Sequence, residues 1–169
     1  MDTIYEYPYD GITQRITVKI KKLTPSGRIP AKATVGAAAY DIYTPRDYVV
    51  APGRQVLPLD IAIELPEGYE AKIEPRSGYS AKGMEGMLDG VICRFDADVL
   101  VGKIDSDYRG NVGVIVKSYA RQKYVIPAGT RIAQLTIYRA QSAIFIESDE
   151  LSATDRGDGG FGHTNEKAK

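Results

Sequence analysis

Apolar residues recur at every second position along much of this chain, and this period of two constrains the fold more than any other feature. The alternation runs through residues 16–20, 61–65 and 69–73. Side chains on a β-strand point to opposite faces in turn, so such segments are typical of strands with one buried face. A Pro66-Glu67-Gly68 turn separates the second run from the third, and this arrangement predicts a β-hairpin.

The remaining apolar runs predict more strands, joined by turns rather than by helices. They lie at about residues 91–95, 111–118, 122–126, 131–138 and 142–147. Pro127-Ala128-Gly129 supplies a turn, and 17 Gly and 9 Pro punctuate the chain at short intervals. Only residues 77–82 and 148–151 suit a helical turn, and residues 83–87 are expected to be flexible. We therefore expect an all-β fold, a sandwich or a barrel.

Length, charge and cysteine content limit the class of protein. A chain of 169 residues is expected to form one domain. Its 22 Lys and Arg balance 22 Asp and Glu, which argues against a nucleic-acid or membrane-surface binder. Cys93 is the only cysteine, so an internal disulfide is impossible and a reducing compartment is expected. Residues 1–10 do not resemble a signal peptide, and no apolar run reaches the length of a membrane span, so we expect a cytoplasmic protein.

Composition divides the chain into three parts. Residues 1–15 precede the first strand and are expected to be an N-terminal extension, and residues 16–153 form the β domain. Residues 154–169 are Gly-rich and charged, with no apolar alternation, which is typical of a flexible arm. Phe161 is the one aromatic residue among the glycines of this arm, and it suggests a binding role.

Asp105 is the candidate catalytic residue. It follows Ile104 shortly after the apolar run of residues 99–101. A carboxylate there can accept a proton from water and so make the water a better nucleophile. The sequence Asp105-Ser106-Asp107 is also typical of an ordinary turn, so local sequence leaves both interpretations open.

A candidate anion site follows a proline at Arg76-Ser77-Gly78. A guanidinium, a hydroxyl and backbone N–H groups together suit a phosphate, although Ser77 also suits a helix N-cap. Gln134 lies on the predicted strand at 131–138, where its neutral amide could hold a phosphate or a water, or could simply face solvent. Asp41 suits a turn or a supporting role.

Five short segments, in this order, extend these candidates to the whole chain. They are residues 37–43, 75–80, 102–110, 129–135 and 156–164. Together they resemble the five motifs of the trimeric dUTP diphosphatase (dUTPase) family, over about residues 16–165. The resemblance implies a jelly-roll-like β-barrel that assembles as a homotrimer, with its C-terminal arm exchanged over a neighbouring site. Three chains would then contribute to each site.

The resemblance also implies a reaction, in which dUTP and water give dUMP and pyrophosphate. This activity keeps uracil out of DNA and supplies dUMP for thymidylate synthesis. Asp105 would activate the water that attacks the α-phosphorus, and Tyr108 would pack against the deoxyribose and exclude a 2′-hydroxyl. The substrate-binding residues that the resemblance implies are Arg76, Ser77, Gly78, Val99, Leu100, Gly102, Lys103, Ile104, Tyr108, Gln134, Arg156, Phe161, Gly162, His163 and Thr164.

Magnesium is the implied cofactor. Mg²⁺ keeps its waters and is commonly bound through substrate phosphates, so no direct protein ligand is expected. Asp41 and Gln134 would support the ion from a second layer. One His and one Cys cannot build a transition-metal site, and the chain contains no Walker loop or dinucleotide fingerprint.

The chain departs from the family pattern at several positions. His163 replaces the usual Ser of the arm, Asn165 the usual Gly, and Ala39 a Gly of the first motif. The spacing between the second and third motifs is longer than usual, which indicates an insertion near 83–98. It could shape the uracil pocket, extend the trimer contact or bind a protein partner, or be a tolerated surface hairpin.

Three other functions compete with the dUTPase reaction. A dCTP deaminase of the same fold would need a catalytic Glu where this chain has Ile115. A regulatory module of the kind encoded by some phages would still carry the motif residues. A structural jelly-roll protein would have no need for Arg76, Asp105, Gln134 and Phe161 together.

Overall fold

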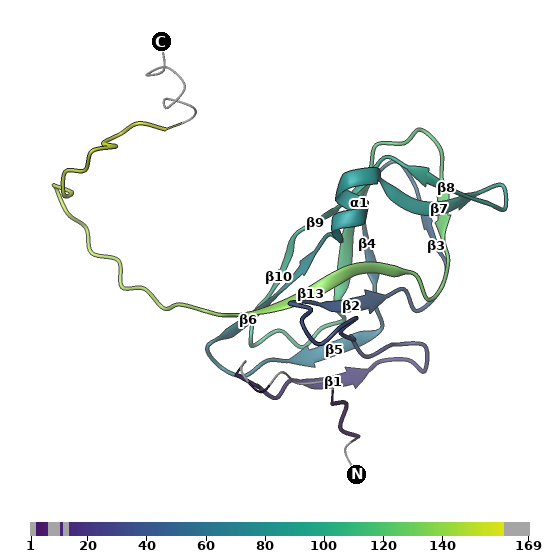
Figure 1. Cartoon of the computed structure of the whole chain (residues 1–169), viewed down its shortest axis with the longest axis horizontal. Helices are drawn as coiled ribbons and strands as arrows, with labels where there is room; N and C mark the ends of the chain where they lie inside the picture. Colours follow the sequence, from purple (N-terminus) through teal and green to yellow (C-terminus); the bar gives the residue numbers. More distant parts are fainter. Residues whose placement is uncertain (1–2, 7–10, 12–13, 161–169) are drawn as a thin grey trace.

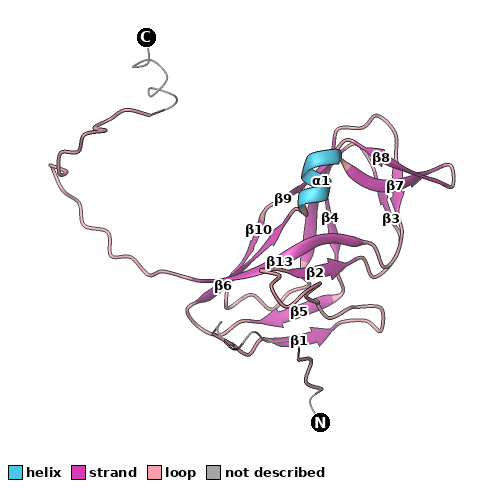
Figure 2. Cartoon of the chain, viewed as in Figure 1, coloured by secondary structure: helices cyan, strands magenta, loops and turns pink. Residues whose placement is uncertain are grey.

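The computed structural model describes residues 3–6, 11 and 14–160. Within that part of the chain it contains thirteen strands and one short helix (Figure 2). The strands form four small sheets in which every ladder is antiparallel. The all-β prediction is confirmed.

The four sheets lie around one core, as Figure 1 shows. One sheet pairs β1 (Lys19–Lys22) with β5 (Ile61–Glu64). A second has the order β10 (Gly102–Ile104), β6 (Tyr69–Glu74), β13 (Arg131–Arg139) and β2 (Tyr40–Tyr43). A third has the order β4 (Gly53–Pro58), β11 (Gly113–Ser118) and β9 (Ala97–Leu100). The fourth has the order β3 (Tyr48–Val50), β12 (Tyr124–Ile126), β7 (Met84–Leu88) and β8 (Val91–Phe95).

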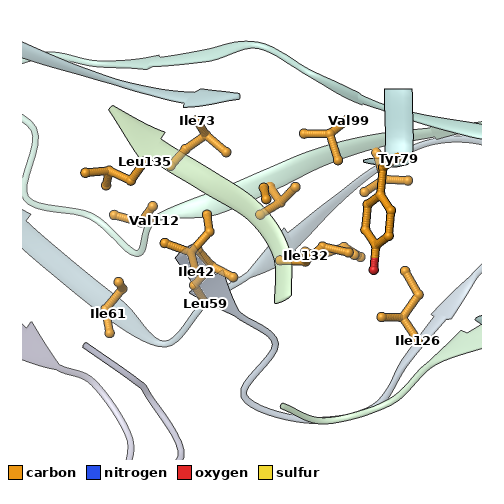
Figure 3. Packing of buried hydrophobic residues seen from close by; sticks show 14 of the residues in the cluster. Ile42, Leu59, Ile61, Ile73, Tyr79, Val99, Val112, Ile126, Ile132 and Leu135 are labelled. Atoms are coloured by element: carbon orange, nitrogen blue, oxygen red, sulfur yellow. The ribbon is translucent and has the colours of Figure 1, made fainter. Parts of the chain in front are cut away.

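The predicted alternation is clearest in β11. Val114, Val116 and Ser118 are buried, and the residues between them are half-buried. Similar inward-facing residues from the other strands meet in the core that Figure 3 shows. Ile42, Ile73 and Ile132 come from three strands of one sheet and are each about 99% buried or more. Burial of this apolar surface is the main force that holds the sheets together.

The predicted hairpin between residues 61–65 and 69–73 is wrong, although both strands and the turn exist. Tyr69 N donates to Pro66 O at 3.2 Å, and Gly68 takes the positive φ that the turn requires. The two strands then separate. β5 pairs with β1, and β6 pairs along its whole length with β13 on one side and with β10 on the other. The β13 ladder runs the whole length of β6 and the β10 ladder covers residues 71–73, so both sides of β6 are paired, whereas a local hairpin would pair only one side.

The segment predicted to be an insertion contains a hairpin that the sequence only partly predicted. The strand expected at 91–95 is confirmed as β8, but residues 84–88 form strand β7 instead of a flexible segment. Asp89 and Gly90 join them with φ of 51° and 80°. An Asp-Gly pair with positive φ is a strong hairpin signal because its twist matches that of the strands.

The predicted helical turn is confirmed as α1 (Ser77–Lys82). Tyr79 anchors it in the core, and burial raises the pKa of the Tyr79 phenol. The helix ends at Gly83, which has a φ of 77° and donates its N–H to Tyr79 O at 2.9 Å. A side chain at Gly83 would meet the Phe95 carbonyl, so this position needs glycine. No helix in the described part of the chain could span a bilayer.

The strand predicted at 142–147 and the helical turn predicted at 148–151 are both wrong. The chain leaves β13 and runs away from the barrel (Figure 1). Ile144, Phe145 and Ile146 are 91%, 95% and 85% exposed. No strand of the described residues lies beside this segment, so it has no partner to complete a ladder.

Candidate functional site

Three of the predicted motifs meet in the sheet β10-β6-β13-β2. Gln134 on β13 lies directly between Asp41 on β2 and Glu74 on β6. Cross-strand neighbours share one face of a sheet, so these three polar side chains form a row. They line a hollow of about 370 Å³ with Thr136, Tyr138 and several alanines of residues 33–39. The sequence predicted Asp41 and Gln134 here, but not Glu74.

Asp41 binds two guanidiniums at the end of this row. Arg76 Nε lies 3.7 Å from Asp41 Oδ1, and Arg131 Nη1 lies 3.3 Å from Asp41 Oδ2. Arg76 also donates from Nη1 to the Arg131 carbonyl at 3.1 Å. Two guanidiniums at one end of the row can donate charge-assisted hydrogen bonds to an anionic ligand.

Arg131 is the residue of this cluster that sequence reasoning missed. It lies in the fourth motif segment, three positions before Gln134, opposite Tyr43 on β2. A register shift between Arg131 and Ala133 turns this end of the strand. Such bulges often redirect a side chain beside a functional site. The sequence did contain a signal for it: Arg131 begins the predicted strand at 131–138 that also carries the candidate Gln134.

Gln134 connects the fourth motif to the second. Its Nε2 donates to the Pro75 carbonyl at 2.9 Å, directly before Arg76. Arg76 itself is extended and precedes α1, while Ser77 and Gly78 are exposed in the first turn of that helix. The structure therefore brings Arg76, Gln134 and Asp41 together, with Ser77 and Gly78 directly after Arg76 in the chain.

The third motif occupies the loop after β10. Asp105 is exposed, and its carbonyl accepts the Tyr108 N–H at 3.1 Å in a tight turn. The Tyr108 hydroxyl donates to the Asn111 carbonyl at 3.0 Å. The ring then lies so close to Gly110 that a Cβ there would be 2.4 Å from the hydroxyl oxygen. Gly110 thus allows Tyr108 to fold back over its own loop.

The other predicted residues of the third motif lie on β9 and β10. Val99 and Ile104 are buried, and Leu100 and Gly102 are half-buried. Lys103 is exposed and forms an ion pair with Glu70 across the β10–β6 ladder. The hydrogen bond between them raises the pKa of Lys103 and lowers the pKa of Glu70. β9 and β10 are each the edge strand of their sheet.

One chain does not bring Asp105 and Arg76 together. Ile104 pairs with Ala71, so Asp105 is level with Glu70 near the start of β6. Arg76 follows the opposite end of β6. Six residues of extended chain at about 3.3 Å each separate these levels, so the backbone positions of the two residues lie on the order of 20 Å apart along β6.

The C-terminal arm lies apart from both clusters. Arg156 is exposed and donates from Nε to the Gly159 carbonyl at 2.7 Å, within the arm itself. Figure 1 shows this segment well away from the barrel. Phe161, Gly162, His163 and Thr164 lie outside the described residues.

A magnesium ion bound to substrate phosphates would find two polar side chains beside the arginines, Asp41 and Gln134, that could contact its waters. The described part of the chain has no group of three or more His, Cys, Asp or Glu that could hold a metal ion. The Asp41 carboxylate is already engaged by two arginines. Mg²⁺ needs few protein ligands when phosphates and waters complete its shell.

Comparisons with known proteins agree with one another. A family model described as dUTPase matches residues 26–165. The deoxyuridine 5′-triphosphate nucleotidohydrolase of Syntrophotalea carbinolica is 38% identical over 152 residues, which cover 88% of this chain and 97% of that protein. A monkeypox virus protein of the same name is 38% identical over 87% of this chain and 89% of its own.

Solved structures are similar as well. A dUTPase of Staphylococcus bacteriophage 80alpha with dUpNHpp superposes with a TM-score of 0.73 at 27% identity, covering 88% of this chain and 98% of that one. A dUTPase of phage phi11, described with a structural Mg(II) ion, has a TM-score of 0.68 at 25% identity, covering 80% and 98%.

Proposed function

This chain belongs to the dUTPase family and is a dUTP diphosphatase, and we propose that Asp105 activates the water that attacks the α-phosphorus of dUTP. The products are dUMP and pyrophosphate. The observation that carries the assignment is the position of Asp105, exposed at the end of β10 in a turn closed by the Tyr108 N–H. The turn fixes the backbone from which the exposed Asp105 carboxylate projects, and such a carboxylate can take a proton from water.

Sugar and base selection follow from the same loop. Tyr108 is held by its hydroxyl bond to Asn111 and packs against the deoxyribose, where it leaves no room for a 2′-hydroxyl. The backbone of Val99, Leu100 and Gly102–Ile104 binds the uracil edge. β9 and β10 are edge strands, so one side of each has backbone groups without a strand partner in the described chain. A wrong base leaves those groups unpaired, which costs affinity.

The triphosphate binds at the Asp41 cluster. Arg76, Ser77, Gly78 and Gln134 contact phosphate oxygens, and Asp41 holds Arg76 in place with the help of Arg131. Magnesium, when bound to the phosphates, spreads their negative charge. Asp41 and Gln134 are the residues that would touch its waters. The protein contributes mostly position and electrostatic stabilisation, as is usual for phosphoryl transfer.

The complete site needs more than one chain. About 20 Å separates Asp105 from Arg76 along one β6, so the two must act on one substrate from different copies. Ile144, Phe145 and Ile146 are exposed in one chain, as expected for a segment that lies on a neighbour. A homotrimer in which the arm crosses to another subunit satisfies both conditions. Arg156, Phe161, Gly162, His163 and Thr164 then close over the substrate.

Pyrophosphate release from four nucleotides tests this function. We expect the purified protein to release pyrophosphate from dUTP, and much less from dCTP, dTTP and UTP, with Mg²⁺ increasing the rate. Equal release from dUTP and UTP would contradict the role of Tyr108. Binding of dUTP without release would show that the catalytic step is absent from this chain.

A further inference from the structure

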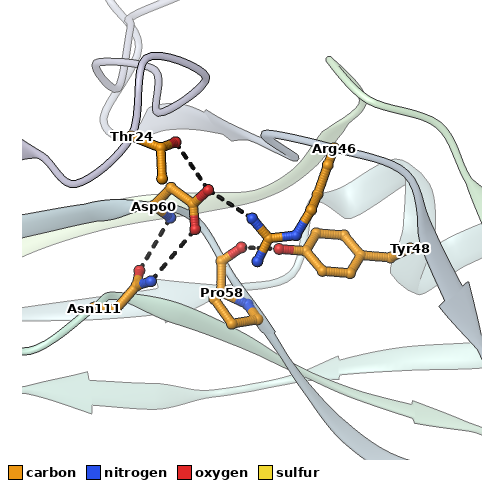
Figure 4. Close-up of polar contacts among 6 residues, drawn as sticks. All are labelled: Thr24, Arg46, Tyr48, Pro58, Asp60 and Asn111. Carbon is orange, nitrogen blue, oxygen red and sulfur yellow. Dashed lines mark hydrogen bonds and ion pairs between the residues drawn. The ribbon is translucent and has the colours of Figure 1, made fainter.

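Asp60 is a buried charged residue that has no role in the reaction proposed above. It lies between β4 and β5, is 4% exposed, and has a φ of 57° in the left-handed region. A non-glycine residue rarely takes this conformation unless its surroundings require it. Figure 4 shows Asp60 at the centre of a polar cluster.

One carboxylate oxygen of Asp60 is held on the side away from the third motif. Arg46 Nη1 donates to Oδ2 at 2.6 Å, and Thr24 Oγ1 donates to the same atom at 3.0 Å. The side chain of Arg46 is 51% exposed, whereas that of Asp60 is 5% exposed. The Arg46 bond balances the charge of the buried carboxylate, and the Thr24 hydroxyl adds a second, neutral bond to the same oxygen.

The other side of Asp60 holds Asn111. The Asp60 N–H donates to Asn111 Oδ1 at 3.0 Å, and Asn111 Nδ2 lies 3.4 Å from Asp60 Oδ1 (Figure 4). A carboxylate only accepts hydrogen bonds, so it specifies which way the Asn111 amide faces. Leu59 N and Ile61 O also pair with Val112, at 2.8 Å each. Asp60 thus fixes the residue at which the third motif loop joins β11.

Asn111 in turn holds the reactive loop. Its carbonyl accepts the Tyr108 hydroxyl at 3.0 Å, and Tyr108 N donates to the Asp105 carbonyl at 3.1 Å. Gly110 lies against the Tyr108 ring, where a larger residue would collide with that ring. A continuous path of hydrogen bonds therefore leads from the buried carboxylate to Tyr108 and Asp105.

We propose that Asp60 is a positioning residue: through Asn111 it sets the place of Tyr108 and Asp105 relative to the substrate. The proposal rests on the roles of Asp105 and Tyr108 given above. A small displacement of a reacting group slows an enzyme strongly, by up to about 100-fold for 1 Å. Asp60 is therefore expected to affect the rate and the selection of sugar, although it touches neither substrate nor water.

Asp60→Gly tests the carboxylate alone. Glycine accepts the positive φ and keeps the backbone N–H that binds Asn111 Oδ1, but removes the bond to Nδ2. We expect kcat for dUTP to fall about tenfold with KM changed less, and the preference for dUTP over UTP to narrow by a similar factor. Asn111 is exposed, and Asn111→Ala should lower kcat and narrow the dUTP preference by similar factors. The double variant should lose no more kcat than either single variant, because both changes break the same contact.

Thr24→Val is the matched control. It removes a hydrogen bond to the same carboxylate from the far side and leaves Asn111 in contact. We expect its melting temperature to fall while kcat and the ratio of dUTP to UTP activity stay within twofold of wild type. Unchanged kcat and sugar preference in folded Asp60→Gly and Asn111→Ala would overturn the proposal and show that Asp60 only stabilises the fold. If instead the wild type releases no pyrophosphate, the proposed function fails, whatever these variants do.

Discussion

Arg76 and Asp41 are joined at the end of one sheet, with Arg76 Nε 3.7 Å from Asp41 Oδ1, although they belong to different motifs. Arg131 binds the other oxygen of the same carboxylate, so Asp41 sets the direction of two cations. Side chains of Asp41 and Arg76 are 13% and 29% exposed, which leaves the pair partly open to a ligand.

Asp41→Asn is expected to reduce activity more than stability. The amide keeps the volume but loses the charge-assisted bonds, so Arg76 is held less firmly. We expect kcat/KM for dUTP to fall about tenfold, while the free energy of unfolding changes by less than about 1 kcal/mol because the pair is partly exposed. Asp89→Asn, in the β7–β8 turn, is the control and should change neither quantity. A large loss of stability with unchanged kcat/KM would assign Asp41 to the fold instead.

Asp105→Asn tests the water-activating residue. The amide cannot accept the proton, and Asp105 is exposed, so the fold should not depend on its charge. We expect the assembly to be intact and kcat to fall by about 10²–10⁴, the usual contribution of a general base. Asp107→Asn, exposed in the same loop, should keep most of the activity. A fully active Asp105→Asn enzyme would show that another group activates the water.

Gly78→Ala tests whether a substrate phosphate lies against the backbone of Gly78, because the change should affect dUTP binding without harming the fold. A Cβ at Gly78 meets no atom of the chain within 4 Å, and Ala is the better helix former by up to about 1 kcal/mol. We expect an unchanged or higher melting temperature together with weaker dUTP binding, because phosphate must come close to this backbone. Ser80→Ala, exposed on the same helix, is the matched control for activity. Normal KM in Gly78→Ala would place the phosphates elsewhere.

The Glu70–Lys103 pair is expected to contribute a pH-dependent stability. The hydrogen bond from Lys103 lowers the pKa of Glu70 below its usual value of 4.5. A lowered folded-state pKa stabilises the protein above the unfolded pKa, and this contribution is lost as the pH falls through the folded pKa. The melting temperature of wild type should therefore exceed that of Glu70→Gln at pH 7, and the difference should shrink below about pH 4.5.

Glu67→Gln is the control for this titration, because Glu67 is exposed in the turn before β6. The melting temperature of Glu67→Gln should stay close to that of wild type from pH 7 to pH 3. A Glu70→Gln difference that is constant from pH 7 to pH 3 would show that the ion pair with Lys103 does not form in solution.

The arm and the apolar segment before it should have separable roles. Deleting residues 154–169 is expected to leave the assembly intact, since residues 154–158 are exposed, and to remove most dUTP turnover. Phe145→Ser is expected to weaken the assembly instead, because Phe145 is 95% exposed in one chain and needs a neighbour to cover it.

Light scattering and pyrophosphate release measure the two effects. A Phe145→Ser protein of unchanged mass at all concentrations would show that the segment does not lie on another subunit. Full turnover in the deletion variant would show that Arg156 and the residues after it are not needed for catalysis.

Local sequence determined most strands, the helix and the identity of the motif residues. β11 and β13 follow from the period of two, and α1 follows from the stretch after Pro75. These features depend on neighbours a few positions away, which is where side-chain alternation and turn preferences act. The resemblance over the five segments then supplied the family and its reaction, which local patterns alone did not.

Only the tertiary structure decided which strands pair and which candidates meet. β5 and β6 flank a good turn, yet each finds a different and distant partner. Residues 142–147 contain an apolar run that predicts a strand, but no strand of the described residues lies beside them. Asp105 and Arg76 separate to opposite ends of β6, and Asp60 meets Asn111 beneath the loop. Pairing depends on the total of long-range hydrogen bonds and buried surface, and no local pattern contains that information.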